Sequence, residues 1–356
     1  MPEETALEEK PASKGSSGEP ERSERRMGTP LAALIVALSA VTVLVASAQR
    51  SPATAATPGP ASLASAAALG LPGPLPSGAQ ARPNGELLSF DGCSFPDRGF
   101  GEYEAWRRLP VGRALVPRDG AVDGADGGFN LLLHFHGAEP VRKQLVLEDT
   151  DLVIVGVDAG TLSSHYTRML SAEGSFAALI ASIEREVAVA TRRTESHARH
   201  ITVSSWSAGY GAVAQILARP DARRLDGLIL LDSLHGGYAR GPGSRAVDHR
   251  VDPTSLQPFL SFAHEATAGG PLFYLTHSAV ATDGYASTTD VASMVLEEVG
   301  APTHDVTPNP GDALRLTRMS DEGRFFLRGY AGGSKEDHCA QLRLLPSIVR
   351  ERLLRR

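Results

Sequence analysis

The sequence predicts a single α/β domain with a mostly parallel central sheet that is covered by helices on both faces. Short apolar runs, such as FNLLLHFHG at 129–137 and LVIVGVDAG at 152–160, alternate along the chain with amphipathic stretches. Continuous apolar runs of this length are typical of strands that are buried on both faces. Strands that alternate with helices indicate a parallel sheet.

Each expected element has its own signal in the sequence. Gly137 and Gly160 end the first two apolar runs, and EGSFAALIASIEREVAVATR has the spacing of an amphipathic helix. Pro220 stops the helix that follows HITVSSW. The expected strands are 129–137, 152–160, 200–206, 225–232, 271–278 and 324–330. The expected helices are about 173–192, 208–218, 254–267 and 288–299, and one from about 336 onward.

Composition excludes several classes of protein. The 356 residues are 42% hydrophobic, which is ordinary for a globular protein and leaves ample material for a core. The net charge of -6 argues against a nucleic-acid partner, which selects for a basic surface. Two cysteines are too few for a zinc ribbon or a disulfide-dense scaffold.

Four segments divide the chain. Residues 1–30 are polar and charged, and residues 31–48 form the uncharged run LAALIVALSAVTVLVASA. Residues 49–84 are rich in Ala, Pro, Ser and Gly, which predicts a flexible tether. The folded domain is expected to span residues 85–356.

The apolar run at 31–48 is either a transmembrane anchor or a signal-peptide core. It is about long enough to cross a bilayer, and basic residues before it would keep the N-terminus in the cytoplasm. Ala46-Ser47-Ala48 has the small-x-small pattern of a signal-peptidase site, although the charged region before the run is long for a signal peptide. A start at Met27 would remove those basic residues and weaken the signal-peptide interpretation. Both interpretations place the domain outside the cytoplasm, anchored to the membrane through 31–48 or released after Ala48.

Ser207 is the expected nucleophile. In Ser205-Trp206-Ser207-Ala208-Gly209 it lies where a strand turns sharply into a helix, and small residues are needed there because strand and helix nearly collide. Ser205 stands where glycine is commonest. The alternative role of Ser207 is to cap the helix, and Ser204 and Ser205 lack a glycine two residues later.

The chain resembles the α/β-hydrolase superfamily from about residue 85 to 356. The resemblance lies in the order of elements, in Ser207 within its elbow, in His134-Phe135-His136-Gly137, and in a histidine after the last strand. It implies the α/β-hydrolase fold and serine-hydrolase chemistry, without indicating a substrate or a subfamily.

Serine-hydrolase chemistry needs two donors for the oxyanion of the tetrahedral intermediate. One is expected to be the N–H of Ala208, and the other the N–H of Gly137 or Ala138 in the loop after an earlier strand. His134 and His136 have the spacing for a shared metal, but no third ligand is apparent nearby. We therefore expect neither a metal nor a cofactor.

His338 is the expected general base because it follows the last strand, in GGSKEDHCAQL. His235 and His277 follow earlier strands and are better interpreted as pocket-lining or structural. The acid of the triad is less clearly marked in the sequence. Asp232 ends a strand and is favoured. Asp283 lies in the commoner position of the superfamily but several residues beyond its strand, and Asp290 is a third choice.

Two further features leave alternatives open. The residues from Leu234 to Pro271 either cover the site as a lid or, as is more usual for an apolar helix stripe, pack on the domain.

Cys93 and Cys339 either form a disulfide, as an oxidising compartment favours, or remain thiols. A disulfide would tie the start of the domain to the residue beside His338.

These observations together predict an extracytoplasmic serine hydrolase that cleaves a small-molecule or polymer carboxylic ester through an acyl-enzyme. A serine peptidase or amidase would use the same machinery. A catalytically silent domain of the same fold that binds a ligand is the alternative from another class.

Overall fold

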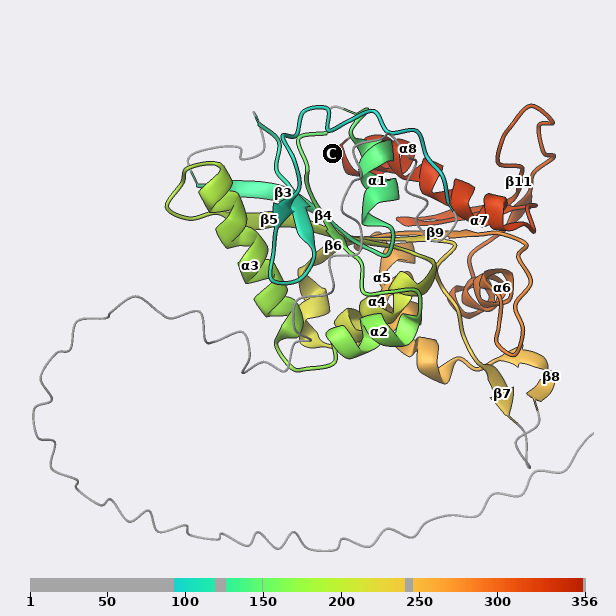
Figure 1. The fold of residues 1–356 in the computed structure, drawn as a ribbon. Coiled ribbons are helices and arrows are strands. Elements are labelled where there is room, and N and C mark those ends of the chain that lie inside the picture. Colours follow the sequence, from blue (N-terminus) through green and yellow to red (C-terminus); the bar gives the residue numbers. More distant parts are fainter. Residues whose placement is uncertain (1–92, 119–125, 149, 241–245, 355–356) are drawn as a thin grey trace, which may run out of the picture. The chain divides into compact units, whose positions relative to one another are not determined.

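A ten-stranded sheet forms the centre of the part that the structure, a computed structural model, describes: residues 93–118, 126–148, 150–240 and 246–354 (Figure 1). The strand order is β1-β2-β4-β3-β5-β6-β9-β12-β11-β10. In that order the strands are Arg107–Arg108, Arg113–Leu115, Val153–Val157, Gly128–Phe135, His197–Trp206, Leu225–Leu231, Leu272–His277, Phe325–Tyr330, Leu316–Glu322 and His304–Asp305.

The central strands run parallel, as the sequence predicts. Each pairing from β4 through β3, β5, β6 and β9 to β12 is parallel, and these strands match the expected apolar runs closely. Both edges of the sheet are antiparallel, through β1 and β2 on one side and β11 and β10 on the other. A separate hairpin pairs β7 (Tyr238–Arg240) with β8 (Ala246–Val251).

Helices cover both faces of the sheet (Figure 1). On one face lie α2 (Ser163–Met169), α3 (Ser175–Ala190), α4 (Tyr210–Leu217), α5 (Gln257–Thr267) and α6 (Thr288–Val299). On the other face lie α1 (Ala138–Leu145), α7 (Lys335–Ala340) and α8 (Leu345–Ile348). The fold class expected from the sequence is therefore the observed one.

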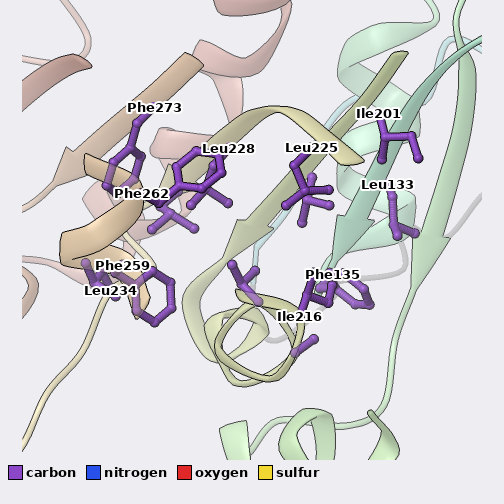
Figure 2. Close-up of a cluster of buried hydrophobic side chains, with 14 of the residues drawn as sticks. Leu133, Phe135, Ile201, Ile216, Leu225, Leu228, Leu234, Phe259, Phe262 and Phe273 are labelled. Atoms are coloured by element: carbon purple, nitrogen blue, oxygen red, sulfur yellow. The ribbon is translucent and has the colours of Figure 1, made fainter. Parts of the chain in front are cut away.

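The two faces have separate hydrophobic cores, because successive side chains of a strand point to opposite sides. Along β3, Leu131 and Leu133 belong to the larger core, and Leu132 belongs to the smaller one. Figure 2 shows part of the larger core, where side chains from β3, β5, β6 and β9 meet those of α4 and α5. Because a hydrophobic core packs against each face of the sheet, the carboxyl ends of these strands have fixed positions.

Helix α5 packs on the domain and does not form a lid. The apolar stripe consists of Leu256, in the turn just before the helix, and of Phe259, Leu260 and Phe262, and all four are buried in the larger core. The more usual of the two interpretations of this stripe is therefore the observed one.

The predicted segments 1–30, 31–48 and 49–84 lie outside the described residues, as does the expected domain start at 85. Among the described residues, no helix is both long enough and apolar enough to span a bilayer.

Candidate active site

Three non-glycine residues with left-handed backbone conformations mark the carboxyl ends of adjacent strands. His136 follows β3 with φ 72°, Ser207 follows β5 with φ 48°, and Asp232 follows β6 with φ 45°. Non-glycine residues are rarely found in this region, and where they are, they cluster at functional sites. The chain therefore turns sharply at three neighbouring points of one sheet edge.

Ser207 lies in the tight strand-to-helix turn that the sequence predicts. β5 ends at Trp206, a single 3₁₀ turn covers Ser207–Gly209, and α4 begins at Tyr210. A Cβ atom on Gly209 would overlap the backbone oxygen of Phe135, so only glycine fits there. Ser207 remains partly exposed at the turn, which presents its hydroxyl to solvent.

The two competing serines have other partners. Ser204 is fully buried, and its Oγ lies 2.7 Å from Nδ1 of His134. Ser205 is also buried and donates to Oγ of Ser233 at 2.7 Å, because Ser233 uses its own proton on the backbone oxygen of Ser207 at 2.9 Å. The serine that replaces the usual glycine thus supports the elbow through Ser233.

His338 meets Asp232 across the open edge of the sheet. Nδ1 of His338, in α7, lies 2.7 Å from Oδ2 of Asp232. An ionised carboxylate only accepts hydrogen bonds, so this contact places the proton on Nδ1 and leaves Nε2 as the acceptor nitrogen. The side chain of His338 is 18% exposed, whereas that of Asp232 is 1% exposed.

Asp232 is held as a buried carboxylate by a full set of donors. Ser278 donates its N–H to Oδ1 at 2.8 Å and its hydroxyl to Oδ2 at 2.5 Å, and Thr288 donates its hydroxyl to Oδ1 at 2.5 Å. Burial raises the pKa of Asp232, but hydrogen bonds from His338, Ser278 and Thr288 outweigh it and lower the pKa to about 2. Asp232 is therefore ionised across the physiological range.

The two other candidate acids lie elsewhere. Asp283 is exposed in the loop after β9. Asp290 forms the capping box of α6 with Ser287 and accepts from the hydroxyl of Tyr238 at 3.0 Å. The commoner acid position of the superfamily, after β9, is occupied here by Ser278, which donates to Asp232.

Trp206 and a disulfide hold His338 in place. The indole ring stacks on the His338 ring with centroids 4.6 Å apart, and its Nε1–H donates to the backbone oxygen of His338 at 3.0 Å. The indole also stacks on the His136 ring, with centroids 5.1 Å apart. Cys339 forms a disulfide with Cys93, which settles the open question of the cysteines.

The expected oxyanion donors after β3 already have an acceptor. The N–H groups of Gly137 and Ala138 both donate to Oδ1 of Asp158, at 2.7 and 3.2 Å. Asp158 follows β4, and β4 lies on the opposite side of β3 from β5 and Ser207. An oxyanion would therefore have to displace this carboxylate, which caps α1. The role of Gly137, Ala138 and Ala208 stays a prediction.

His134 and His136 are committed to contacts within the protein. Nε2 of His134 lies 2.8 Å from the backbone oxygen of His136, and Nδ1 of His136 lies 2.8 Å from the hydroxyl of Tyr166. Burial lowers the pKa of His134 to about 3, so the ring is neutral. Within the described ranges, no group of three or more His, Cys, Asp or Glu side chains is placed to hold a metal.

The two remaining strand-end histidines differ in their surroundings. His277 pairs through Nδ1 with Thr289 at 3.0 Å, and its Nε2 accepts from Arg318 at 2.8 Å. His277 therefore belongs to the structural framework behind Asp232. His235 instead lies between the rings of Tyr210 and Tyr285.

Sequence reasoning missed the residues that support this site. Ser278, Thr288 and Trp206 contact Asp232 or His338 from remote parts of the chain. Of these, only Trp206 carried a signal, since it is a large aromatic residue directly before the elbow serine. Ser278 also ends an expected strand, but nothing local distinguishes it from an ordinary strand-end serine.

The parallel sheet, the elbow after β5, the acid after β6 and the histidine after β12 occur in the chain order Ser, Asp, His. The chain has the α/β-hydrolase fold. No protein-family model matches the sequence, and no curated protein matches it.

Several solved α/β structures show a distant likeness. Acylaminoacyl peptidase from Pyrococcus horikoshii matches with a TM-score of 0.41 and 12% identity over 72% of this chain, which spans only 42% of the peptidase. Esterase 2 from Thermogutta terrifontis matches with a TM-score of 0.37 and 13% identity over 68% of this chain and 90% of its own. An esterase from Pyrobaculum calidifontis matches with a TM-score of 0.37 and 13% identity, covering 70% and 85%.

Proposed function

We propose that this chain is a serine hydrolase that cleaves a carboxylic ester through an acyl-enzyme. The observation that carries the proposal is the 2.7 Å contact between Nδ1 of His338 and buried Asp232, beside the strained elbow at Ser207. A catalytically silent domain of this fold would not need an ionised acid held by three further donors next to a histidine. The arrangement therefore favours catalysis over simple binding.

Each member of the triad has one role in the proposed reaction. Nε2 of His338 accepts the proton of Ser207 as Oγ attacks the ester carbonyl, and it returns that proton to the leaving alcohol. Water then hydrolyses the acyl-enzyme by the same route in reverse. Asp232 stays ionised throughout, holds the tautomer of His338, and stabilises the imidazolium that forms.

The oxyanion is stabilised by the N–H of Ala208 and by that of Gly137 or Ala138. For the second donor, the Asp158 carboxylate has to give way to the oxyanion when the substrate binds. Nη2 of Arg113 already lies 3.8 Å from Oδ2 of Asp158 and can keep that carboxylate paired after it leaves the two N–H groups. Losing one such donor costs about 2.7–4 kcal/mol of transition-state stabilisation.

The reaction takes place outside the cytoplasm. The disulfide between Cys93 and Cys339 supports this part of the proposal, because such bonds persist in oxidising compartments. The predicted anchor or signal at 31–48 points the same way.

Covalent labelling tests the nucleophile. We expect a fluorophosphonate probe to label the full-length protein, and Ser207→Ala to abolish both labelling and ester hydrolysis while leaving the thermal unfolding temperature nearly unchanged. Ser171→Ala is the matched control, because Ser171 is exposed and donates only to the backbone oxygen of Arg168. Retained turnover in Ser207→Ala would sink the assignment.

Turnover of matched substrates then separates the remaining activities. An ester panel measured against peptide amides with the same acyl groups distinguishes an esterase from a peptidase or amidase. We expect the esters to be cleaved faster.

A further inference from the structure

A strip of uncharged side chains crosses the carboxyl edge of the sheet beside Ser207. It consists of Leu162 after β4, Tyr210 after β5, His235 after β6 and Tyr285 after β9, and we call it the aromatic strip. Four loops of the open edge, three of them after the adjacent strands β5, β6 and β9, thus each contribute one large side chain. The active-site chemistry described above uses none of them.

The three ring-bearing members of the aromatic strip contact one another in order, and Leu162 directly precedes a residue that bonds to the first of them. The hydroxyl of Tyr210 donates to Oγ of Ser163, the residue after Leu162, at 3.3 Å. The rings of Tyr210 and His235 lie 5.6 Å apart, and those of His235 and Tyr285 lie 5.4 Å apart in an edge-to-face arrangement. Such pairs prefer these distances and angles, so the strip is a packed surface.

Backbone contacts hold the outer end of the strip in place. Ala286 donates its N–H to the oxygen of Gly236 at 2.9 Å, which ties the loop after β9 to the loop after β6. The hydroxyl of Thr282 donates to the oxygen of Tyr285 at 2.6 Å. Tyr285 is therefore positioned before any ligand arrives.

The strip borders the candidate triad directly. Tyr210 follows Ser207 by one helical turn, and His235 follows Asp232 by the same number of residues. Because the contact between the Tyr210 and His235 rings joins the loops after β5 and β6, the strip spans the ends of the two strands that carry Ser207 and Asp232. A group bound on the strip would lie next to an ester held at Ser207.

The exposure and charge of the strip indicate what it binds. Leu162 is 59% exposed and Tyr285 is 45% exposed, although both are large and apolar. Burial lowers the pKa of His235 and raises the pKa of Tyr285, so the imidazole and the phenol are both neutral at neutral pH. An uncharged surface with one exposed phenol ring beside two partly buried rings fits a neutral aromatic ring better than an ion or a flexible alkyl chain.

We propose that the aromatic strip binds an aromatic ring of the ester substrate, carried by the acyl or the alcohol group. The substrate class is then an aryl-containing neutral ester. This inference rests on the proposed function for the reaction, but the binding of the ring itself does not require turnover.

Matched ester pairs test the strip through kcat/KM. Methyl phenylacetate is compared with methyl cyclohexylacetate for an acyl-side ring, and benzyl acetate with cyclohexylmethyl acetate for an alcohol-side ring. We expect the aromatic member of one pair to be preferred by about three- to tenfold. Tyr285→Ala should lower that preference toward unity and Tyr285→Phe should keep it, whereas Val189→Ala, at an exposed apolar residue of α3, should leave it unchanged.

Binding without turnover separates this proposal from the proposed function. In the Ser207→Ala background, ligand-observed NMR measures benzyl alcohol against cyclohexylmethanol, with and without Tyr285→Ala. If no ester is hydrolysed but Tyr285→Ala weakens only benzyl alcohol binding, the strip stands and the hydrolase proposal fails. Equal rates for both members of each pair, together with no effect of Tyr285→Ala on either measurement, would overturn the strip.

Discussion

Asp232 receives hydrogen bonds from residues that lie far from it in the sequence. Ser278 is 46 residues away, Thr288 is 56 and His338 is 106. Four donors in a buried site keep a carboxylate ionised where burial alone would favour its neutral form. The acid is thus defined by its surroundings more than by its own position in the chain.

Removing the charge of Asp232 tests this arrangement. Asp232→Asn keeps the size of the side chain but favours the wrong tautomer of His338, so we expect kcat to fall by about ten-thousandfold. Circular dichroism should show that the fold is intact. Asp283→Asn is the matched control, since its carboxylate is exposed in the next loop, and kcat should change little. A similar loss in both variants would contradict the role of Asp232.

The candidate site could be predicted in part from the sequence, because some of its signals are local. The elbow has a small-x-Ser-x-Gly pattern between strand and helix, and His338 follows the last apolar run. The choice between Asp232 and Asp283 could not be decided locally, because both follow strands. It depends on contacts between distant segments: α7 carries His338 to Asp232, and the end of β9 supplies Ser278 as a donor to that carboxylate.

Helices and strands could be predicted where their burial produces a recognisable pattern of apolar residues along the sequence. The central strands are buried on both faces and appear as continuous apolar runs. The edge strands β10 and β11 carry polar residues, such as Thr317, Arg318 and Asp321, and so look like loops in the sequence. Helix α2, Ser163–Met169, is short and mostly polar, and it was missed for the same reason.

Helix α7 carries His338 on only six residues, so its position depends on what holds its ends. Ser334 and Asp337 form a capping box at the start, and Cys339 is bonded to Cys93. The bond closes a loop across 246 residues of sequence. We expect it both to stabilise the fold and to position the base.

The double variant Cys93→Ser/Cys339→Ser tests both effects. Loss of the cross-link should lower the free energy of unfolding by about 2–5 kcal/mol, measured by urea denaturation. At a temperature where the variant is still folded, kcat should fall more than KM changes, because only the position of His338 is loosened. Adding dithiothreitol to the wild type should lower kcat in the same way. An unchanged kcat would show that Trp206 and Asp232 hold His338 without the disulfide.

At the scale of the whole molecule, the candidate site lies along one open edge of the sheet. The ends of β4, β5, β6 and β9 supply the aromatic strip, and α7 brings His338 across to Asp232. A packed core on each face holds these strand ends, so the loops that carry the chemistry rest on rigid supports. The Cys93–Cys339 disulfide lies beside His338 and forms only under oxidising conditions. The position of His338 therefore depends on the compartment in which the chain folds.

The compartment is the last prediction. Because basic residues precede the apolar run at 31–48, the chain after residue 84 should be exported. Alkaline phosphatase fused after residue 84 should be active in a bacterial host, since it needs an oxidising compartment, whereas a fusion after residue 28 should be inactive.

Membrane fractionation of the unfused protein then distinguishes an anchor from a cleaved signal. Cleavage would leave a soluble chain that begins at Gln49. Thiol labelling of the denatured, exported protein should find no free cysteine. An inactive phosphatase after residue 84, with free Cys93 and Cys339, would place the domain in the cytoplasm and remove the oxidising conditions that the disulfide requires.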